Sequence, residues 1–117
     1  MKRRGNLYTA VMDGCVFCKI VAKEIPADIV KETENFIVFK DLHPKADIHL
    51  LIVPKTHYND IHTIPENEWK EVRDIAINLG KEFKLNGFRL VNNAGEAAAV
   101  NHLHVHFLGE VDQEREI

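Results

Sequence analysis

The sequence has little cysteine, no long hydrophobic run and no excess of positive charge. Two cysteines in 117 residues are too few for the disulfide framework of a small secreted domain. A net charge of −3 argues against binding nucleic acid or an anionic membrane through bulk charge. No apolar stretch approaches the length of a membrane-spanning helix. We therefore expect a cytoplasmic protein with neither nucleic acid nor a membrane as its partner.

Internal repeats, low-complexity tracts and linkers are also lacking. A length of 117 residues suits one compact hydrophobic core and leaves no room for a second. The breaking residues Gly5, Asn6 and Gly14 predict a flexible N-terminal extension over residues 1–14. Residues 15–117 are then expected to form a single domain.

Hydrophobic periodicity predicts two helices in this domain. Residues 16–23 carry apolar side chains at helical spacing. Pro65 suits the first turn of a second helix, in which Trp69 and further apolar residues recur at three- and four-residue steps as far as about residue 84. Gly87 is expected to cap the end of this second helix.

Strands are predicted between and after the helices. The β-branched and aromatic segments at residues 28–32 and 35–40 predict a hairpin. Residues 48–53 are almost continuously apolar, which indicates a central strand. Residues 88–92 and 102–108 are predicted to form the remaining two strands. This order predicts an α+β fold with an antiparallel sheet of about five strands and two helices.

Three histidines, His102, His104 and His106, alternate with apolar residues near the C-terminus. Alternation with period two predicts a half-buried strand with all three imidazoles on one face. Side chains on the same face are spaced by about 6.5–7 Å, so a single metal ion would strain to bind all three. The row suits an extended phosphate-bearing ligand, because near neutral pH one imidazole can be a nucleophile while its neighbour donates a proton.

This alternating signature resembles that of the histidine triad (HIT) family of nucleotide hydrolases and transferases. The likeness spans roughly residues 15–110 and includes the segments 15–20, 24–27, 39–41 and 47–57. The branch of small nucleoside phosphoramidases is the most similar, and His106 favours hydrolysis because the transferase branch usually has Gln at that position. The resemblance implies a HIT fold whose sheet continues across a homodimer, with residues 88–91 and the helix from Pro65 at the two-fold axis.

The resemblance also implies an activity, namely hydrolysis of purine nucleoside 5′-phosphoramidates, such as AMP linked to an amine or to lysine. His104 would be the nucleophile and would form a nucleotidyl-histidine intermediate. His102 and His106 would donate hydrogen bonds to the phosphate oxygens, and His106 or a bound water would protonate the leaving amine. His49 would support the triad from a neighbouring strand. Catalysis would require no cofactor.

A purine nucleotide site is implied in the same way. Asn93 matches an asparagine near the phosphate, and Asp41 matches a carboxylate that accepts both ribose hydroxyls. The apolar slot for the purine would consist of Val16, Phe17, Ile20, Phe39 and Leu42. Ala98 and Ala99 replace polar residues that are common in relatives, which leaves the backbone amides of Ala99 and Val100 to contact the phosphate. Apart from the resemblance, ordinary core packing explains each apolar residue of the slot.

Cys15 and Cys18 have half of the spacing of a zinc site. In the bacterial-type HIT proteins that the chain resembles, two histidines complete such a site, and here they would be His49 and His102. The result would be a closed structural zinc site. Inert buried thiols and a redox pair are the alternatives, although the residues before Cys15 do not have the pattern of a strand that a thioredoxin-like unit requires.

Two other functions are compatible with the sequence. The first is hydrolysis of dinucleoside polyphosphates. The second is a weakly catalytic nucleotide- or zinc-binding module that acts through partners, which the replacements at Ala98 and Ala99 favour and the intact triad opposes.

Overall fold

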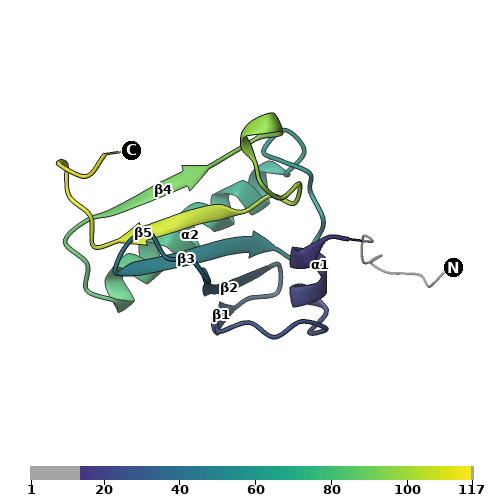
Figure 1. Ribbon diagram of the computed structural model, residues 1–117, viewed down its shortest axis with the longest axis horizontal. Helices are drawn as coiled ribbons and strands as arrows, with labels where there is room; N and C mark the ends of the chain where they lie inside the picture. The colour runs from purple at the N-terminus through teal and green to yellow at the C-terminus, as the bar shows by residue number, and fades with distance from the viewer. Residues whose placement is uncertain (1–13, 117) are drawn as a thin grey trace, which may run out of the picture.

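The computed structural model describes residues 14–116, so the predicted extension over residues 1–14 lies outside the described residues except for Gly14. The elements follow in the order α1 (Val16–Val21), β1 (Ile29–Glu32), β2 (Phe36–Lys40), β3 (Ile48–Pro54), α2 (Glu66–Glu82), β4 (Phe88–Asn92) and β5 (Val105–Gly109), with a 3₁₀ turn at Gly95–Ala97. The strands pair antiparallel in one sheet of order β1-β2-β3-β5-β4 (Figure 1). The predicted α+β fold is confirmed.

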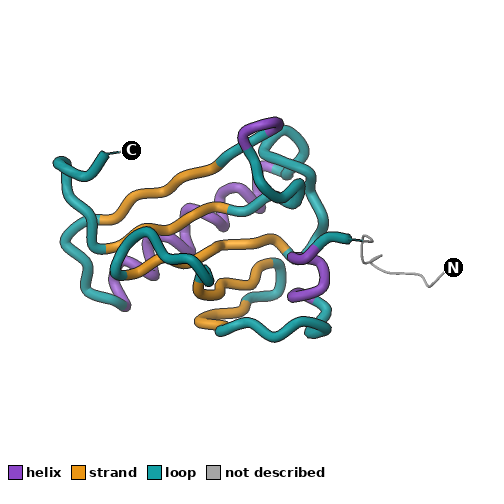
Figure 2. Tube along the Cα trace, viewed as in Figure 1, coloured by secondary structure: helices purple, strands orange, loops and turns teal. Residues whose placement is uncertain are grey.

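The two helices pack on opposite faces of the sheet (Figure 2). Phe36 and Val38 of β2 belong to the apolar cluster that contains α2, whereas Ile37 and Phe39 belong to the cluster that contains α1. Successive side chains of a strand point to opposite faces, so both faces of β2 are covered. This double burial explains why β2 and β3 have almost continuous apolar sequences.

The long helix α2 follows from its apolar stripe. It buries Val72, Ile75, Ala76 and Leu79 against the sheet. Pro65 is its N-cap residue, and the helix ends at Glu82, after which Lys84 adopts a left-handed φ of 55°. The prediction of Gly87 as the helix cap was therefore wrong. Glycine is needed at position 87 because a Cβ there would lie 2.6 Å from the carbonyl oxygen of Val111. No helix within residues 14–116 is long and apolar enough to cross a membrane.

The strand that carries the histidines is shorter than predicted. β5 begins at Val105, so His102 and His104 precede it and His106 lies inside it. Just before β5, the backbone N–H of Leu103 donates a hydrogen bond to the carbonyl of Tyr58 at 2.7 Å, outside the sheet ladder. The prediction of three imidazoles in one row on a regular strand was wrong, and each ring has its own set of partners.

Candidate active site and metal centre

His104 is held in one orientation by its own backbone neighbourhood. Its Nδ1 lies 2.8 Å from the carbonyl oxygen of His102, and since a carbonyl can only accept, Nδ1 carries the proton. The lone pair of the neutral ring is then on Nε2. The amide of Asn92 fixes the backbone by donating to the His104 carbonyl at 3.0 Å. The ring is only 5 % exposed, with the edge of Phe17 at a centroid distance of 5.0 Å and the ring of His106 at 5.2 Å.

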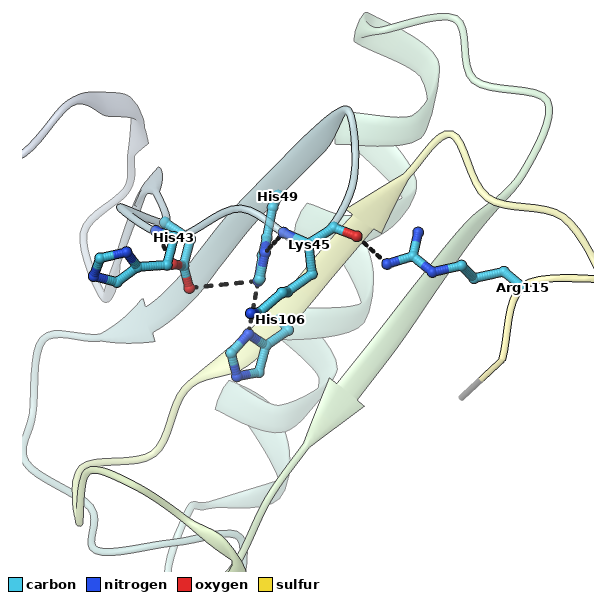
Figure 3. Close-up of polar contacts among 6 residues, drawn as sticks. His43, Lys45, His49, His106 and Arg115 are labelled. Atoms are coloured by element: carbon cyan, nitrogen blue, oxygen red, sulfur yellow. Dashed lines mark hydrogen bonds and ion pairs between the residues drawn. The ribbon is translucent and has the colours of Figure 1, made fainter.

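His106 is joined to a second polar group that comes from β3 and the loop before it. His49 Nε2 lies 2.9 Å from His106 Nδ1 and 3.4 Å from the Asp41 carboxylate. The backbone N–H of Lys45 donates to His49 Nδ1 at 2.9 Å. Figure 3 shows His49 between Lys45 and His106. These contacts place three of the predicted site residues, Asp41, His49 and His106, in one cluster.

Burial and neighbouring groups keep the two imidazoles of this cluster uncharged. Burial lowers the pKa of His49, and the positive charges of Lys45 and Arg115 lower it further, although Asp41 opposes the shift. Burial also lowers the pKa of His106, with a smaller contribution from His104 and His49 and again an opposing one from Asp41. Both imidazoles therefore favour the uncharged form at neutral pH.

A cavity of about 410 Å³ opens in front of this cluster, a size suited to a small-molecule ligand. Asp41, His49, Asn93 and His106 line it together with the basic side chains of Lys45, Arg89 and Arg115. The acidic residues in the lining are Asp41 and Glu116, so positive charge predominates. The cavity suits an anionic ligand.

The residues of the predicted purine slot are divided between two environments. Phe17, Ile20 and Phe39 are buried in the apolar cluster around α1, in keeping with ordinary core packing. Leu42 is 89 % exposed and Val16 is 38 % exposed. Val16 instead lines a separate cavity of about 400 Å³ together with Ala99 and Val100. The structure therefore does not gather the predicted nucleotide-binding residues around one cavity.

A second cluster combines both cysteines with two histidines. Single donor atoms of Cys15, Cys18, His57 and His102 all lie within 4.8 Å of one another. The Sγ of Cys15 is 3.3 Å from His102 Nδ1, and the Sγ of Cys18 is 3.2 Å from His57 Nδ1. Ligands of a tetrahedral zinc ion at about 2.3 Å for sulfur and 2.0–2.1 Å for nitrogen would stand about 3.6 Å apart. The spacing fits such an ion.

The outer nitrogens of the two histidines support the same interpretation. His102 Nε2 donates to the Pro54 carbonyl at 2.9 Å, and His57 Nε2 donates to the side-chain oxygen of Asn59 at 3.1 Å. Each lone pair is then on Nδ1 and faces the sulfurs, as in zinc sites whose histidines are oriented by a carbonyl behind them. Burial lowers the pKa of His102 to about 4, which keeps that lone pair available.

Two predicted roles need correction. His49 was expected to complete the cysteine site, but both of its ring nitrogens bind within the other cluster, and His57 takes that place. His102 was expected to touch the phosphate, but its side chain is fully buried between Pro54 and the cysteines. His102 acts on the site through its backbone carbonyl, which orients His104. The sequence offers little to identify His57 as a metal ligand. It lies three residues after the end of β3, and no spacing rule for zinc ligands relates that position to the cysteines.

Asp41, His49 and His106 also bring potential ligand atoms within 4.8 Å of one another. Because the Lys45 amide occupies His49 Nδ1, the proton of the neutral His49 ring is on Nε2, the atom that a shared ion would need. This group is therefore a poor metal site and a good hydrogen-bond chain.

Comparison with known proteins places this geometry in a family. The family model described as "HIT domain" matches residues 22–113. The chain is 40 % identical to Protein HitA of Neisseria gonorrhoeae in an alignment over 107 residues, and the match covers 84 % of this chain and 97 % of that protein. It is 37 % identical over 101 residues to adenosine 5′-monophosphoramidase HNT1 of Saccharomyces cerevisiae, which are 85 % of this chain and 64 % of that protein. A solved structure of a HIT family hydrolase from Clostridium thermocellum superposes with a TM-score of 0.79 at 37 % identity, covering 91 % of this chain and 98 % of that one.

Proposed function

The chain belongs to the HIT domain family, and we propose that it hydrolyses purine nucleoside 5′-phosphoramidates through a nucleotidyl-histidine intermediate. Its relatives include HIT family hydrolases and a yeast adenosine 5′-monophosphoramidase. The observation that carries the proposal is the fixed ring of His104, whose Nδ1 proton is held by the His102 carbonyl, so that Nε2 is the nitrogen available as a nucleophile.

The proposed reaction has two steps at phosphorus. His104 Nε2 attacks the α-phosphorus, the Nε2–P bond forms, and the P–N bond breaks as the amine leaves with a proton. Water then cleaves the Nε2–P bond, which releases the nucleoside monophosphate and restores His104. His106 stands beside His104 and supplies an N–H for the charge that builds on the phosphoryl oxygens.

The cavity in front of His106 supports a nucleotide as the ligand. In this proposal Asp41 accepts the ribose hydroxyls and Asn93 lies near the phosphate. The basic side chains of Lys45 and Arg89 provide positive charge for the anionic part of the substrate. Phe17, Ile20 and Phe39 are buried in the apolar cluster around α1 and do not line this cavity.

We further propose that Cys15, Cys18, His57 and His102 hold a structural zinc ion. The ion would supply a closed, four-coordinate crosslink between the start of α1, the end of β3 and the segment before β5. His102 links the two sites, because its ring belongs to the metal set while its carbonyl holds His104. The metal centre would thus fix the nucleophile without touching the substrate.

A homodimer is the proposed assembly. β4 is an edge strand, and Leu90 on it is 42 % exposed at a groove of about 790 Å³ that also includes Ile61, Ile64 and Trp69. An apolar, unpaired edge of this kind is a ready interface for a second copy, which would extend the sheet. Sedimentation velocity tests this, since Leu90→Lys should convert a dimer to a monomer. A wild-type monomer at micromolar concentration would refute the assembly.

Dinucleoside polyphosphate hydrolysis is the second candidate, favoured by the three basic side chains in the cavity lining. Turnover of AMP linked to an aliphatic amine, measured beside turnover of a diadenosine polyphosphate, separates the two. We expect kcat/KM to be higher for the amide, and His104→Asn to abolish both. Higher kcat/KM for the polyphosphate would make dinucleoside polyphosphate hydrolysis the favoured function. Tight AMP binding by calorimetry without any turnover would favour the binding module instead.

A further inference from the structure

A chain of contacts runs from the C-terminal tail to the ring of His106 (Figure 3). The guanidinium of Arg115 donates to the carbonyl of Lys45, whose own N–H donates to His49 Nδ1. His49 Nε2 in turn lies 2.9 Å from His106 Nδ1. The chain is therefore continuous over four residues that come from the tail, the loop before β3, β3 and β5.

The direction of these hydrogen bonds fixes the protons. A backbone N–H can only donate, so His49 Nδ1 is an acceptor and cannot carry a proton. The proton of His49 is then on Nε2 and points at His106 Nδ1, which must accept it. The remaining proton of His106 is on Nε2. A doubly protonated His106 would set two N–H groups against each other across 2.9 Å.

Burial is the largest cause that lowers the pKa of both rings, and some of the neighbouring charges add to it. Lys45 and Arg115 both disfavour a positive charge on His49, and Asp41 is the opposing carboxylate. His104 and His49 disfavour a positive charge on His106, again with Asp41 opposed.

The tail that carries Arg115 is itself anchored. Arg89 on β4 donates to the carbonyl oxygens of Arg115 at 3.1 Å and Glu116 at 3.2 Å, and lies 3.5 Å from that of Asp112. Arg115 then reaches from the anchored tail to the loop at Lys45. The loop is held between the tail on one side and His49 on the other.

We propose that Arg115 is a positioning residue which, through the backbone of Lys45, makes His106 a neutral hydrogen-bond donor rather than the acid of the reaction. This inference narrows the proposed function. As the Nε2–P bond forms, His106 keeps its Nε2 proton and hydrogen-bonds a phosphoryl oxygen. The P–N electron pair goes to the amine, which takes its proton from a water molecule. The hydroxide so formed attacks phosphorus and breaks the Nε2–P bond, so atoms and charge balance.

The protons are tested directly by nitrogen NMR of the full-length protein. Two-bond ¹H–¹⁵N correlations of the histidine rings distinguish a proton on Nδ1 from one on Nε2. We expect His49 and His106 both to carry it on Nε2 near pH 7. A proton on Nδ1 of either ring, or a doubly protonated His106, would overturn the inference. The spectrum needs no substrate, so it holds even if the proposed activity fails.

The role of Arg115 is tested with a matched set of variants. Arg115→Ala should lower kcat for an AMP amide by about tenfold, less than the 10²–10³-fold typical for loss of a direct donor, with KM within about twofold of wild type. Arg115→Lys can still donate to the carbonyl and should restore most of kcat. Lys81→Ala, at an exposed basic residue in the last turn of α2, is the control for loss of a positive charge.

The same variants separate positioning from a general loss of structure. In folded Arg115→Ala, shown by an unchanged thermal midpoint, the His49 and His106 signals should shift toward a mixture of tautomers. Lys45→Ala keeps the backbone N–H and carbonyl and should keep the wild-type tautomers. Wild-type kcat and tautomers in Arg115→Ala would refute the proposal.

Discussion

Two histidine clusters lie next to each other in this protein and differ in which ring nitrogen carries the proton and in what that nitrogen contacts. Around His57 and His102, Nε2 donates to oxygen and the lone pairs of Nδ1 face two thiols in a largely buried group. Around His49 and His106, each hydrogen bond donates toward His106: the Lys45 N–H donates to His49 Nδ1, and His49 Nε2 donates to His106 Nδ1. His106 in turn lines an open cavity. The comparison teaches that the partner behind an imidazole decides which nitrogen carries the lone pair, and with it whether the ring is suited to binding a metal or to donating to a ligand.

The largest expected effect concerns His104, which lies between the two clusters: its Nδ1 donates to the His102 carbonyl and its ring contacts His106. His104→Asn removes the proposed nucleophile and should lower kcat/KM for an AMP amide by about 10⁴-fold or more, because no covalent intermediate can form. The zinc content, measured by elemental analysis, should not change. Activity within tenfold of wild type would contradict the assignment of this ring to catalysis.

His106 comes next and tests the donor side of the comparison. His106→Ala should cost about 10²–10³-fold in kcat, the usual effect of removing a donor to a developing oxyanion. His106→Gln offers an N–H at a similar reach but no acidic proton, so it should lose only about tenfold. Steady-state kinetics decides, and equal losses in the two variants would show that His106 transfers a proton.

A smaller effect is expected on the metal side. Asn59→Ala removes the oxygen behind His57 and should weaken zinc affinity by about 10–100-fold, the typical effect of losing such a partner. Competition with a chromophoric chelator measures it, and Asn35→Ala, whose side chain binds Glu71, is the matched asparagine control. Protein purified without chelator that holds no zinc, with both thiols freely titratable, would remove the metal centre from the account.

The smallest predicted effect is on the pH dependence of stability. The pKa values of His49 and His106 are lowered in the folded state by burial, by Lys45 and Arg115 near His49, and by the other histidines near His106. Below the unfolded value of about 6.5 the unfolded chain therefore binds more protons, so the free energy of unfolding should fall as the pH decreases from there.

Urea unfolding between pH 7.5 and 5 measures this slope. His49→Gln and His106→Gln should each flatten it, whereas the exposed His43→Gln should not. A slope that is the same in all three variants would show that the fold does not hold His49 and His106 in the neutral form.

Much of the fold follows from patterns that the sequence displays. The stripe of α2 and the continuous apolar runs of β2 and β3 predict elements that the structure contains, because both features result from burial on known faces. The end of α2 was misplaced, because Lys84 adopts the left-handed conformation that favours glycine, and Gly87 is kept for a close backbone contact.

The site was harder to predict than the fold. The alternation of His102, His104 and His106 suggested one strand, but β5 begins at Val105, and local contacts turn the first two rings to other partners. The replacement of His49 by His57 in the metal set depends on how the chain leaves β3 after Pro54. Such loop geometry depends on tertiary contacts, and periodicity carries no information about it.

The central claim is that the ring of His104, with its Nδ1 proton held by the His102 carbonyl, becomes covalently nucleotidylated. Rapid quenching of the wild-type protein with an AMP amide, followed by intact-mass and peptide analysis, tests it most directly. The account predicts one adenylyl group on His104 that forms and decays at rates consistent with kcat and is absent from His104→Asn. Full turnover without any such adduct, or an adduct on another residue, would contradict it.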